Sequence, residues 1–447
     1  MYQTYVLSLN STYFMRTNLT LLYTADIHLG RHPSRIPDEL DSPGLSPKAV
    51  WLSTVQRAIE QRVDAVVVAG DIVDQENRYF EAYGAFEDGI AQLDEAGIPV
   101  VTVAGNHDFN ALPEMVDNLD LNLLHLLGKD GTWERWTLER DGQPVAHFDG
   151  WSFSVDHVYE SPIQEYDLPA TDGTPIIGVL HADLDTRGSR YAPVSSSELR
   201  DTAVDAWLLG HIHTPSIQID SQPLTVYAGS PQPLDPGEQA THGPWTITIP
   251  ETGDIHAEQV PLASVRYDQL SVDVSEVLNA KEATAVISDE IKQHVRSELE
   301  TRPLELSLVR LQLTGRTKAH STLVNQHQAM ARDLGFREGS VSVRIESIEV
   351  ATQPAINLED TAKGDNAAAY LAELLLEIET GDAQQAYDDL IDDSLGAIKE
   401  AHAANAYNPL RRETELTDPD HDDAVAQVEQ QARVLLDTLL SQKEGQT

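Results

Sequence analysis

The sequence predicts a layered α/β sandwich followed by a smaller α+β domain and a helical tail. From Leu19 to about Leu262, short apolar runs alternate with helical patterns. Strands that are apolar along their whole length are typical of a sheet covered on both faces. After Asp268, strands of alternating polarity are separated by helical stretches, and after Asp365 the chain is acidic and helical.

The sandwich is expected to begin with three strands separated by two helices. These strands are Leu19–Tyr23, Asp64–Ala69 and Ile98–Ala104. Ser46-Pro47 is a typical helix start, because serine caps the first turn and proline fits the first helical position. The second helix runs from Tyr79 to Ala96. Later strands are expected at Val145–Phe148, Pro175–Leu180, Ala206–Leu209 and Leu224–Tyr227, with a hairpin of Trp245–Ile249 and Ile255–Val260.

The pattern changes around Pro261–Asp268. A β-α-β-α-β unit is expected, with elements at Ser271–Val274, Glu276–Leu299, Leu306–Leu313, His320–Leu334 and Ser340–Val350. Asn357–Asp365 is polar and is predicted to be a linker, with Asp365 capping the next helix. The last helix has an apolar seam of two heptads, formed by Val425, Val428, Ala432, Leu435 and Leu439. Such a seam either packs within the chain or binds a partner helix.

The charge balance is strongly acidic. The chain has 447 residues with 30 basic and 73 acidic side chains, a formal charge of −43. Its cations are 8 lysines and 22 arginines, and this bias predicts a protein from a halophilic archaeon. At ~1 M salt the Debye length is ~3 Å, so net charge no longer excludes a polyanionic partner. The alternative is an acidic protein that avoids nucleic acid.

The chain contains no cysteine, which excludes disulfides, thiolate metal sites and a cysteine nucleophile within it. Any metal must therefore be held by His, Asp, Glu or Asn. No apolar run approaches the ~18 residues of a membrane span, and the start lacks a secretory signal pattern, so we expect a cytoplasmic protein without a membrane association. Residues 1–18 are predicted to be an extension, with Met15 as an alternative start.

Five short segments with polar side chains follow predicted strands. They are Asp26-Ile27-His28, Gly70-Asp71-Ile72-Val73-Asp74, Gly105-Asn106-His107-Asp108, His181 and Gly210-His211-Ile212-His213. The carboxyl ends of strands are where open α/β sheets bind ligands. Mixed carboxylate, amide and imidazole donors suit Mn²⁺, Zn²⁺ or Fe²⁺, whereas Ca²⁺ prefers oxygen alone. Seven candidate ligands exceed one tetrahedral site and fit two ions. Singly, the histidines could instead be buried and hydrogen-bonded, and the aspartates could be helix caps.

In this order, the five segments resemble the motifs of the calcineurin-like metallophosphoesterases. The resemblance implies a four-layer α/β/β/α sandwich and two divalent metal ions, Mn²⁺ by preference. It places Asp26, His28, Asp71 and His213 around the first ion, and Asp71, Asn106, His181 and His211 around the second. It makes His107 the catalytic proton donor, with Asp74 and Asp108 behind the ligands. The implied reaction is hydrolysis of a phosphodiester by a hydroxide that bridges the metals.

Further segments resemble the SbcD-type DNA repair exonucleases within that family. They are Asp26-Ile27-His28-Leu29-Gly30, Leu209-Gly210-His211-Ile212-His213-Thr214-Pro215, and Tyr227-Ala228-Gly229-Ser230-Pro231 followed by Gly237-Glu238. This resemblance implies a nuclease domain at 19–262, a capping domain at 268–352 and an ATPase-docking tail at 365–447. It implies a homodimer that acts as exonuclease and endonuclease on DNA in double-strand break repair, with an SMC-like coiled-coil ATPase as partner. No G-x-x-x-x-G-K-[ST] pattern occurs in the chain, so that ATPase would be a separate polypeptide.

Four arginines near these segments are candidates for contacts with DNA phosphates: Arg31, Arg35, Arg187 and Arg190. The competing interpretation is that they balance neighbouring carboxylates. Two other functions remain open at this point. One is a small-substrate phosphoesterase, either a phosphomonoesterase or a cyclic-nucleotide phosphodiesterase with the same metal site. The other is a non-catalytic scaffold that binds DNA or the ATPase.

Overall fold

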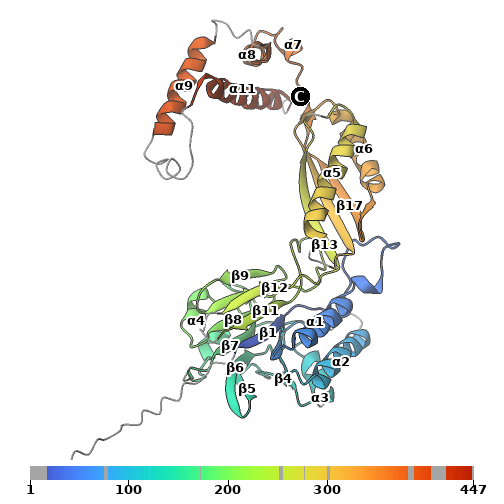
Figure 1. The fold of residues 1–447 in the computed structure, drawn as a ribbon, viewed down its shortest axis with the longest axis vertical. Coiled ribbons are helices and arrows are strands. Elements are labelled where there is room, and N and C mark those ends of the chain that lie inside the picture. The colour runs from blue at the N-terminus through green and yellow to red at the C-terminus, as the bar shows by residue number, and fades with distance from the viewer. Residues whose placement is uncertain are drawn as a thin grey trace, which may run out of the picture. The chain divides into compact units, whose positions relative to one another are not determined.

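The computed structural model describes residues 18–74, 79–119, 121–171, 173–250, 255–275, 277–299, 303–380, 387–403 and 419–444. Apart from Asn18, the predicted extension at 1–18 lies outside the described residues. The chain forms two compact units, one from 1–315 and 322–351, the other from 316–321 and 352–447 (Figure 1).

The first sheet of the first unit has six strands. They are β1 (Leu19–Thr24), β2 (Ala65–Ala69), β3 (Val100–Val103), β4 (Leu124–Leu126), β11 (Trp245–Ile249) and β12 (His256–Gln259). Their order is β12-β11-β1-β2-β3-β4, and β1 to β4 are parallel. The predicted hairpin is present, because β11 and β12 pair antiparallel with Trp245 opposite Gln259.

The second sheet also has six strands. They are β5 (Glu134–Arg140), β6 (Gln143–Trp151), β7 (Ile176–His181), β8 (Ala206–Gly210), β9 (Ser216–Ile219) and β10 (Leu224–Tyr227). Their order is β5-β6-β7-β8-β10-β9, with β6, β7, β8 and β10 parallel. Strand β5 was missed by the sequence analysis, and its pattern explains why: among its seven residues none is fully buried.

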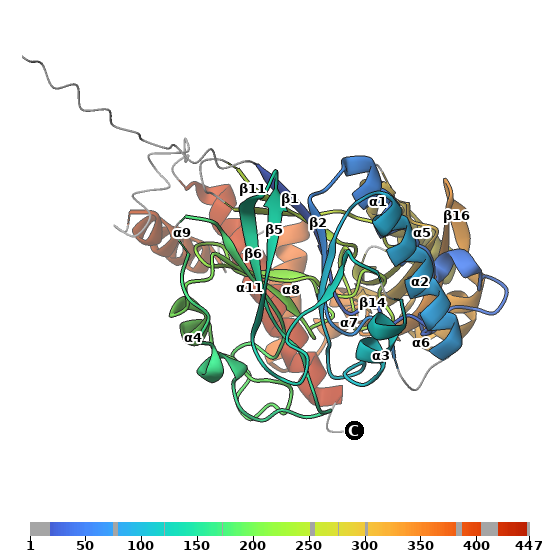
Figure 2. The same cartoon turned by 90° about the horizontal axis from the view of Figure 1, so that it is seen from below.

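The two sheets pack face to face and are covered outside, which confirms the predicted four-layer sandwich (Figure 2). Phe148 and Ile177 of the second sheet join Leu21 and Val67 of the first in one buried core. Outside the first sheet lie α1 (Pro47–Gln61), α2 (Tyr79–Glu95) and α3 (Ala111–Leu119). Outside the second sheet lie loops, the short helix α4 (Ser196–Arg200), and the 3₁₀ turn η2 (Pro162–Glu165).

A third sheet, with four strands, completes the first unit. Strands β13 (Val265–Asp273), β14 (Leu306–Thr314) and β17 (Val341–Val350) are parallel, and β16 (Phe336–Glu338) is antiparallel to β17. Helices α5 (Ala280–Leu299) and α6 (His320–Asp333) connect them. Helix α5 begins later than predicted, because Asn279 caps it by accepting hydrogen bonds from the amides of Lys281 and Glu282. The predicted first residue, Glu276, lies outside the described residues.

This sheet packs on the segment that follows the first motif. Val265, Tyr267, Leu306 and Leu308 form one face of the sheet and are buried against Leu45 of the 3₁₀ turn η1 (Pro43–Leu45). The Tyr267 hydroxyl donates a hydrogen bond to the Ser34 carbonyl oxygen. The sheet is therefore held by packing and a hydrogen bond to the segment from Ser34 to Leu45, which follows the first motif.

The second unit is helical, with a two-strand pair of β15 (Arg316–Thr317) and β18 (Gln353–Pro354). Its helices are α7 (Leu358–Thr361), α8 (Ala367–Thr380), α9 (Asp388–Ala403) and α11 (His421–Glu444). Two predictions were wrong here. Part of the expected linker is the helix α7, and α8 is capped by the Asn366 side chain, which accepts from the Ala368 and Ala369 amides; Asp365 is not that acceptor.

The seam predicted for the last helix is also different. Val428 and Ala432 are buried, but Leu435 is 51% exposed and Leu436 takes its place in the core. The buried positions Ala424, Val428, Ala432 and Leu436 form one row with a spacing of four residues, the kind of ridge that packs into the groove of a neighbouring helix. The seven-residue repeat of a coiled coil is therefore not the one that α11 uses.

Candidate metal centre

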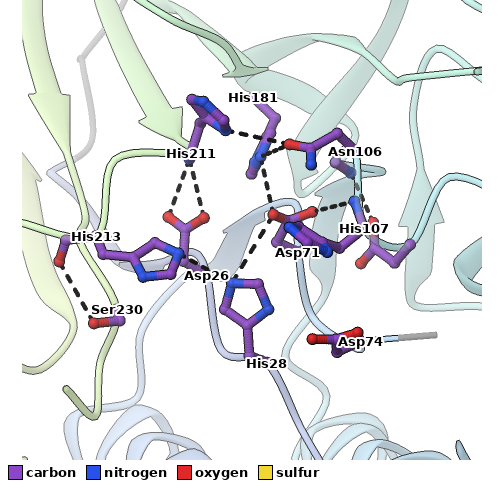
Figure 3. Close-up of polar contacts among 12 residues, drawn as sticks. Asp26, His28, Asp71, Asp74, Asn106, His107, His181, His211, His213 and Ser230 are labelled. Atoms are coloured by element: carbon purple, nitrogen blue, oxygen red, sulfur yellow. Dashed lines mark hydrogen bonds and ion pairs between the residues drawn. The ribbon is translucent and has the colours of Figure 1, made fainter. Parts of the chain in front are cut away.

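The five predicted segments meet at one edge of the sandwich (Figure 3). They follow β1, β2, β3, β7 and β8, and so come from both sheets. The turns are tight, with positive φ angles at Asp26, His28, Asp71 and His211. Backbone hydrogen bonds join the first two segments, since the Asp26 amide donates to Gly70 O and the His28 amide to Asp71 O. The structure thus brings together all seven candidate donors, which lay up to 187 positions apart.

One group of donors consists of Asp26, His28 and His213, whose ligand atoms lie within 4.8 Å of one another. The Nε2 atoms of His28 and His213 are 3.1 Å apart. Burial lowers the pKa of His28 well below its ordinary value, so its ring is neutral, the form that binds metal ions. Two imidazole nitrogens that face each other beside a carboxylate are the arrangement expected around a divalent cation.

The other group contains Asp26, Asp71 and His181, again within 4.8 Å. The Asp71 Oδ2 atom lies 3.2 Å from His181 Nε2 and 4.0 Å from His28 Nε2, so it reaches both groups. Asn106 Oδ1 lies 3.2 Å from His181 Nε2 and 3.2 Å from His211 Nδ1. The Asp26 carboxylate also accepts the His211 amide at 3.0 Å. The carboxylates of Asp26 and Asp71 therefore each lie close to both groups of donors.

The electrostatic field at this point favours positive charge. Burial alone would lower the pKa of His181, yet the adjacent Asp71 carboxylate and its hydrogen bond raise it to about 9. Conversely, burial would raise the pKa of Asp71, but His181 and His28 hold it below its ordinary value. Because buried carboxylates stabilise a cation here, the donor set fits metal ions by its charge as well as by its chemistry.

Three of the rings are oriented through their outer nitrogen. His181 Nδ1 donates to the Ala69 carbonyl oxygen at 2.9 Å, and His213 Nδ1 donates to Glu238 Oε1 at 2.8 Å. His211 Nε2 faces Asp183 Oδ1 at 3.5 Å. Each ring therefore turns its other nitrogen towards the centre, as metal-binding histidines do. Neither Glu238 nor Asp183 was predicted to have a role, although Gly237-Glu238 was among the segments that resemble the family and Asp183 lies two residues after His181.

The remaining predicted residues lie around this centre. The His107 amide donates to Asp71 Oδ1 at 2.9 Å, while its exposed ring lies 5.3 Å from the His28 ring, measured between centroids. Asp108 is buried and accepts the amides of Gly105 and Ile72, both at 2.7 Å, which ties two of the segments together. Asp74 lies 3.8 Å from the guanidinium of Arg31.

Among the described residues, the other three candidate arginines make no hydrogen bond or ion pair with the donors of the candidate centre. Arg35 Nε is 3.8 Å from Glu346 of β17, and the Arg190 guanidinium lies 5.3 Å from the centre of the Tyr191 ring. Arg187 is exposed. The prediction that these side chains contact DNA phosphates remains a prediction.

Two family models match the chain. Residues 19–215 match the calcineurin-like phosphoesterase model, and residues 267–353 match the middle domain of the metallophosphoesterase YhaO. Among the described residues, no helix has both the length and the apolar character that a membrane span requires.

Curated proteins of two kinds are similar to this chain. The uncharacterized metallophosphoesterase YhaO of Bacillus subtilis is 26% identical over 281 residues, which are 62% of this chain and 68% of that protein. The DNA double-strand break repair protein Mre11 of Aeropyrum pernix is 28% identical over 237 residues, 50% of this chain and 56% of that protein. Mre11 of Haloferax volcanii is 28% identical over 265 residues, 56% and 54% respectively. The chain thus spans about half the length of these two Mre11 proteins.

Proposed function

We propose that this metal-dependent phosphoester hydrolase, whose residues 19–215 match the calcineurin-like phosphoesterase model, is a two-metal DNA nuclease of double-strand break repair, of the SbcD type. The observation that carries the hydrolase part is the convergence of five donors into two adjoining groups, with Asn106 and His211 in contact with them. The DNA part is supported by the similarity to proteins named for double-strand break repair.

The proposal assigns the donors to two ions. The first would be held by Asp26, His28, Asp71 and His213, and the second by Asp71, Asn106, His181 and His211. The 3.2 Å and 4.0 Å separations of Asp71 Oδ2 from His181 and His28 support Asp71 as the shared ligand. When bound, two divalent ions, Mn²⁺ in our proposal, would neutralise the phosphoryl oxygens and activate water.

The chain's own residues would position the substrate and move protons. His107 is exposed beside the donors, and in this proposal its ring would protonate the leaving sugar oxygen. Asp108 would keep the segments after β2 and β3 in register through the two amides that it accepts. Asp74 lies beside Arg31, and Arg31, Arg35, Arg187 and Arg190 would contact phosphates along the strand.

The domain assignment belongs to the same proposal. Residues 1–18 would be an extension, 19–262 the nuclease domain, 268–352 a capping domain that contacts DNA, and 365–447 the docking region for a separate SMC-like coiled-coil ATPase. The protein would work as a homodimer in the cytoplasm of a halophile. The four-stranded sheet at 265–350 supports the assignment of a capping domain, because it is a folded body that packs on the segment after the first motif.

A groove in the helical unit supports the docking assignment. It has a volume of about 590 Å³ and is lined by residues of α8, α9 and α11, among them Leu371, Leu390 and Leu435. Leu390 and Leu435 are 46% and 51% exposed, and Val434 is 58% exposed. Half-exposed apolar side chains along a groove are typical of a surface that receives an amphipathic helix.

The second candidate function is a phosphoesterase of small substrates. It is supported by the similarity over 62% of this chain to YhaO, a protein named only as a metallophosphoesterase, and by the match of 267–353 to the YhaO middle domain. The scaffold without catalysis is the weakest alternative, because all seven donors and His107 are present in one place.

The two enzyme functions are separated by substrate. The protein is incubated with Mn²⁺ and either linear duplex DNA or a p-nitrophenyl phosphodiester. Under the proposal, DNA is degraded from its ends, and His107→Ala lowers the rate by about 10²–10⁴-fold, the range for loss of a general acid.

The control is His157→Ala, because His157 lies outside the five motif segments. This variant should leave the rate unchanged. Turnover of the small ester without cleavage of DNA would favour the YhaO-like alternative. If His107→Ala keeps both activities, the proposed role of His107 is contradicted.

A further inference from the structure

The segment Gly229–Glu238, called here the 229–238 loop, has no part in the proposed chemistry, yet it contacts a candidate metal ligand. Glu238 is 9% exposed. Its Oε1 atom accepts a hydrogen bond from His213 Nδ1 at 2.8 Å, and its Oε2 atom accepts from Ser230 Oγ at 2.7 Å and from the Leu234 amide at 2.9 Å. The carboxylate is therefore fixed by the loop itself while it orients the ring.

The same loop also holds the backbone of His213. The Ser230 amide donates to the His213 carbonyl oxygen at 3.0 Å, and Figure 3 shows Ser230 beside His213. His213 is thus bound at its main chain and at its outer ring nitrogen. A shift of the loop would move both contacts, and with them the Nε2 atom that faces His28.

At its other end, the loop is bound to the start of the sheet at 265–350. Gln232 is 1% exposed. Its Nε2 atom donates to Leu45 O at 2.8 Å and to Ser264 Oγ at 3.0 Å, and its Oε1 atom accepts the Ser264 amide at 3.0 Å. Ser264 immediately precedes β13, so two of these three hydrogen bonds join the loop to the start of that sheet, and the third joins it to η1.

A second path runs through Ser34. Its amide donates to the Leu234 carbonyl oxygen at 2.8 Å, and its own carbonyl oxygen accepts the Tyr267 hydroxyl of β13. The loop thus lies between His213 on one side and the sheet on the other, joined to each by hydrogen bonds of buried groups.

We propose that the 229–238 loop transmits the position of the sheet at 265–350 to His213, with Glu238 as a positioning residue for this histidine. The inference rests on the proposed role of His213 as a metal ligand. In this arrangement Gln232 and Tyr267 act on the site only through the loop. A substrate or partner that displaces the sheet would consequently change the binding of the first ion.

The test is calorimetric titration of the metal-free full chain with Mn²⁺, which requires no turnover. Loss of a group that orients a metal-binding histidine costs about 10–100-fold in metal affinity. We therefore expect Glu238→Ala to lower the affinity for one of the two Mn²⁺ ions by that factor. Glu238→Gln should lose less, because its carbonyl oxygen can still accept from His213 Nδ1.

Transmission through the loop is tested by Tyr267→Phe, with Tyr166→Phe as the matched control. Both substitutions remove one phenolic hydroxyl from the first unit, but the Tyr166 hydroxyl donates to Asp149 and has no contact with the loop among the described hydrogen bonds. Tyr267→Phe should weaken the same ion by up to about fivefold, the worth of one hydrogen bond. Tyr166→Phe should leave both affinities unchanged.

Each outcome decides a separate point. Wild-type affinity for both ions in Glu238→Ala, or in Glu238→Leu if the alanine variant does not fold, would overturn the positioning role, because neither side chain can accept from His213 Nδ1. Equal effects of the two tyrosine variants, or none from Tyr267→Phe, would overturn the transmission. If His213→Ala still binds two ions, the ligand assignment itself fails. If that variant loses one ion while Glu238→Ala keeps both, only the present inference fails.

Discussion

Gly105 lies so close to Asp71 in the candidate centre that a side chain at this position does not fit. A Cβ atom at this position would overlap Asp71 Oδ1 and lie 2.8 Å from the Asp71 amide nitrogen. Gly105→Ala must therefore displace the carboxylate that borders both groups of donors. We expect Mn²⁺ affinity to fall at least ~10-fold, as for other losses of ligand orientation, measured by titration of the metal-free protein.

The control for this substitution is Gly84→Ala in α2, where nothing lies within 4 Å of the added atom. Metal affinity should not change there. The free energy of unfolding should rise by about 0.5–1 kcal/mol, because alanine is the better helix former. Unchanged metal binding in Gly105→Ala would show that Asp71 is not held where the structure has it.

Single residues also show what the sequence could and could not predict. The seven donors were predictable because each directly follows an apolar strand, within a short pattern. Glu238 was not, because its contact with His213 joins residues 25 positions apart and depends on how the 229–238 loop folds back. A carboxylate that orients a ligand leaves no periodic signal, whereas a ligand at a strand end does.

Among the elements, the hairpin of β5 and β6 contains the ion pair with the greatest expected effect on stability. Asp149 is fully buried, and Arg135, directly opposite it, binds both carboxylate oxygens at 2.6 Å. Arg135→Ala leaves a buried carboxylate with Tyr166 as its remaining side-chain donor among the described contacts. We expect a loss of about 3–5 kcal/mol in the free energy of unfolding, measured with urea.

Arg140→Ala provides the comparison within the same hairpin. Arg140 pairs with Asp64, but its side chain is 41% exposed, so its loss should cost at most about 1 kcal/mol. Similar losses for the two variants would mean that burial of Asp149 does not control the strength of its pair.

The elements of the sandwich were easier to predict than those of the tail. Continuous apolar runs such as that of β2 have one interpretation, because all five of its residues are buried. In α11, Leu435 and Leu436 are both leucine, so the sequence permits either to face the core. Packing against α8 and α9 selects Leu436, and a single-helix pattern contains no information on that choice.

For the molecule as a whole, the charge of −43 should make stability depend on salt. Repulsion among carboxylates destabilises the compact state at low ionic strength, and at ~1 M salt it acts only within ~3 Å. If the proposed halophilic origin is right, the free energy of unfolding and the nuclease activity should both be higher at 2 M than at 0.1 M KCl. Activity at 0.1 M that disappears at 2 M would contradict it.

His28 and His213 are 185 positions apart and lie on loops of different sheets. A chain that has assembled only its first sheet offers four of the seven donors, so tight binding of both cations requires that the two sheets have docked. Ions that bind the native state alone stabilise it by mass action. A chelator should therefore lower the melting temperature of the entire sandwich. During refolding, the rate of manganese binding would report the rate at which the two sheets dock.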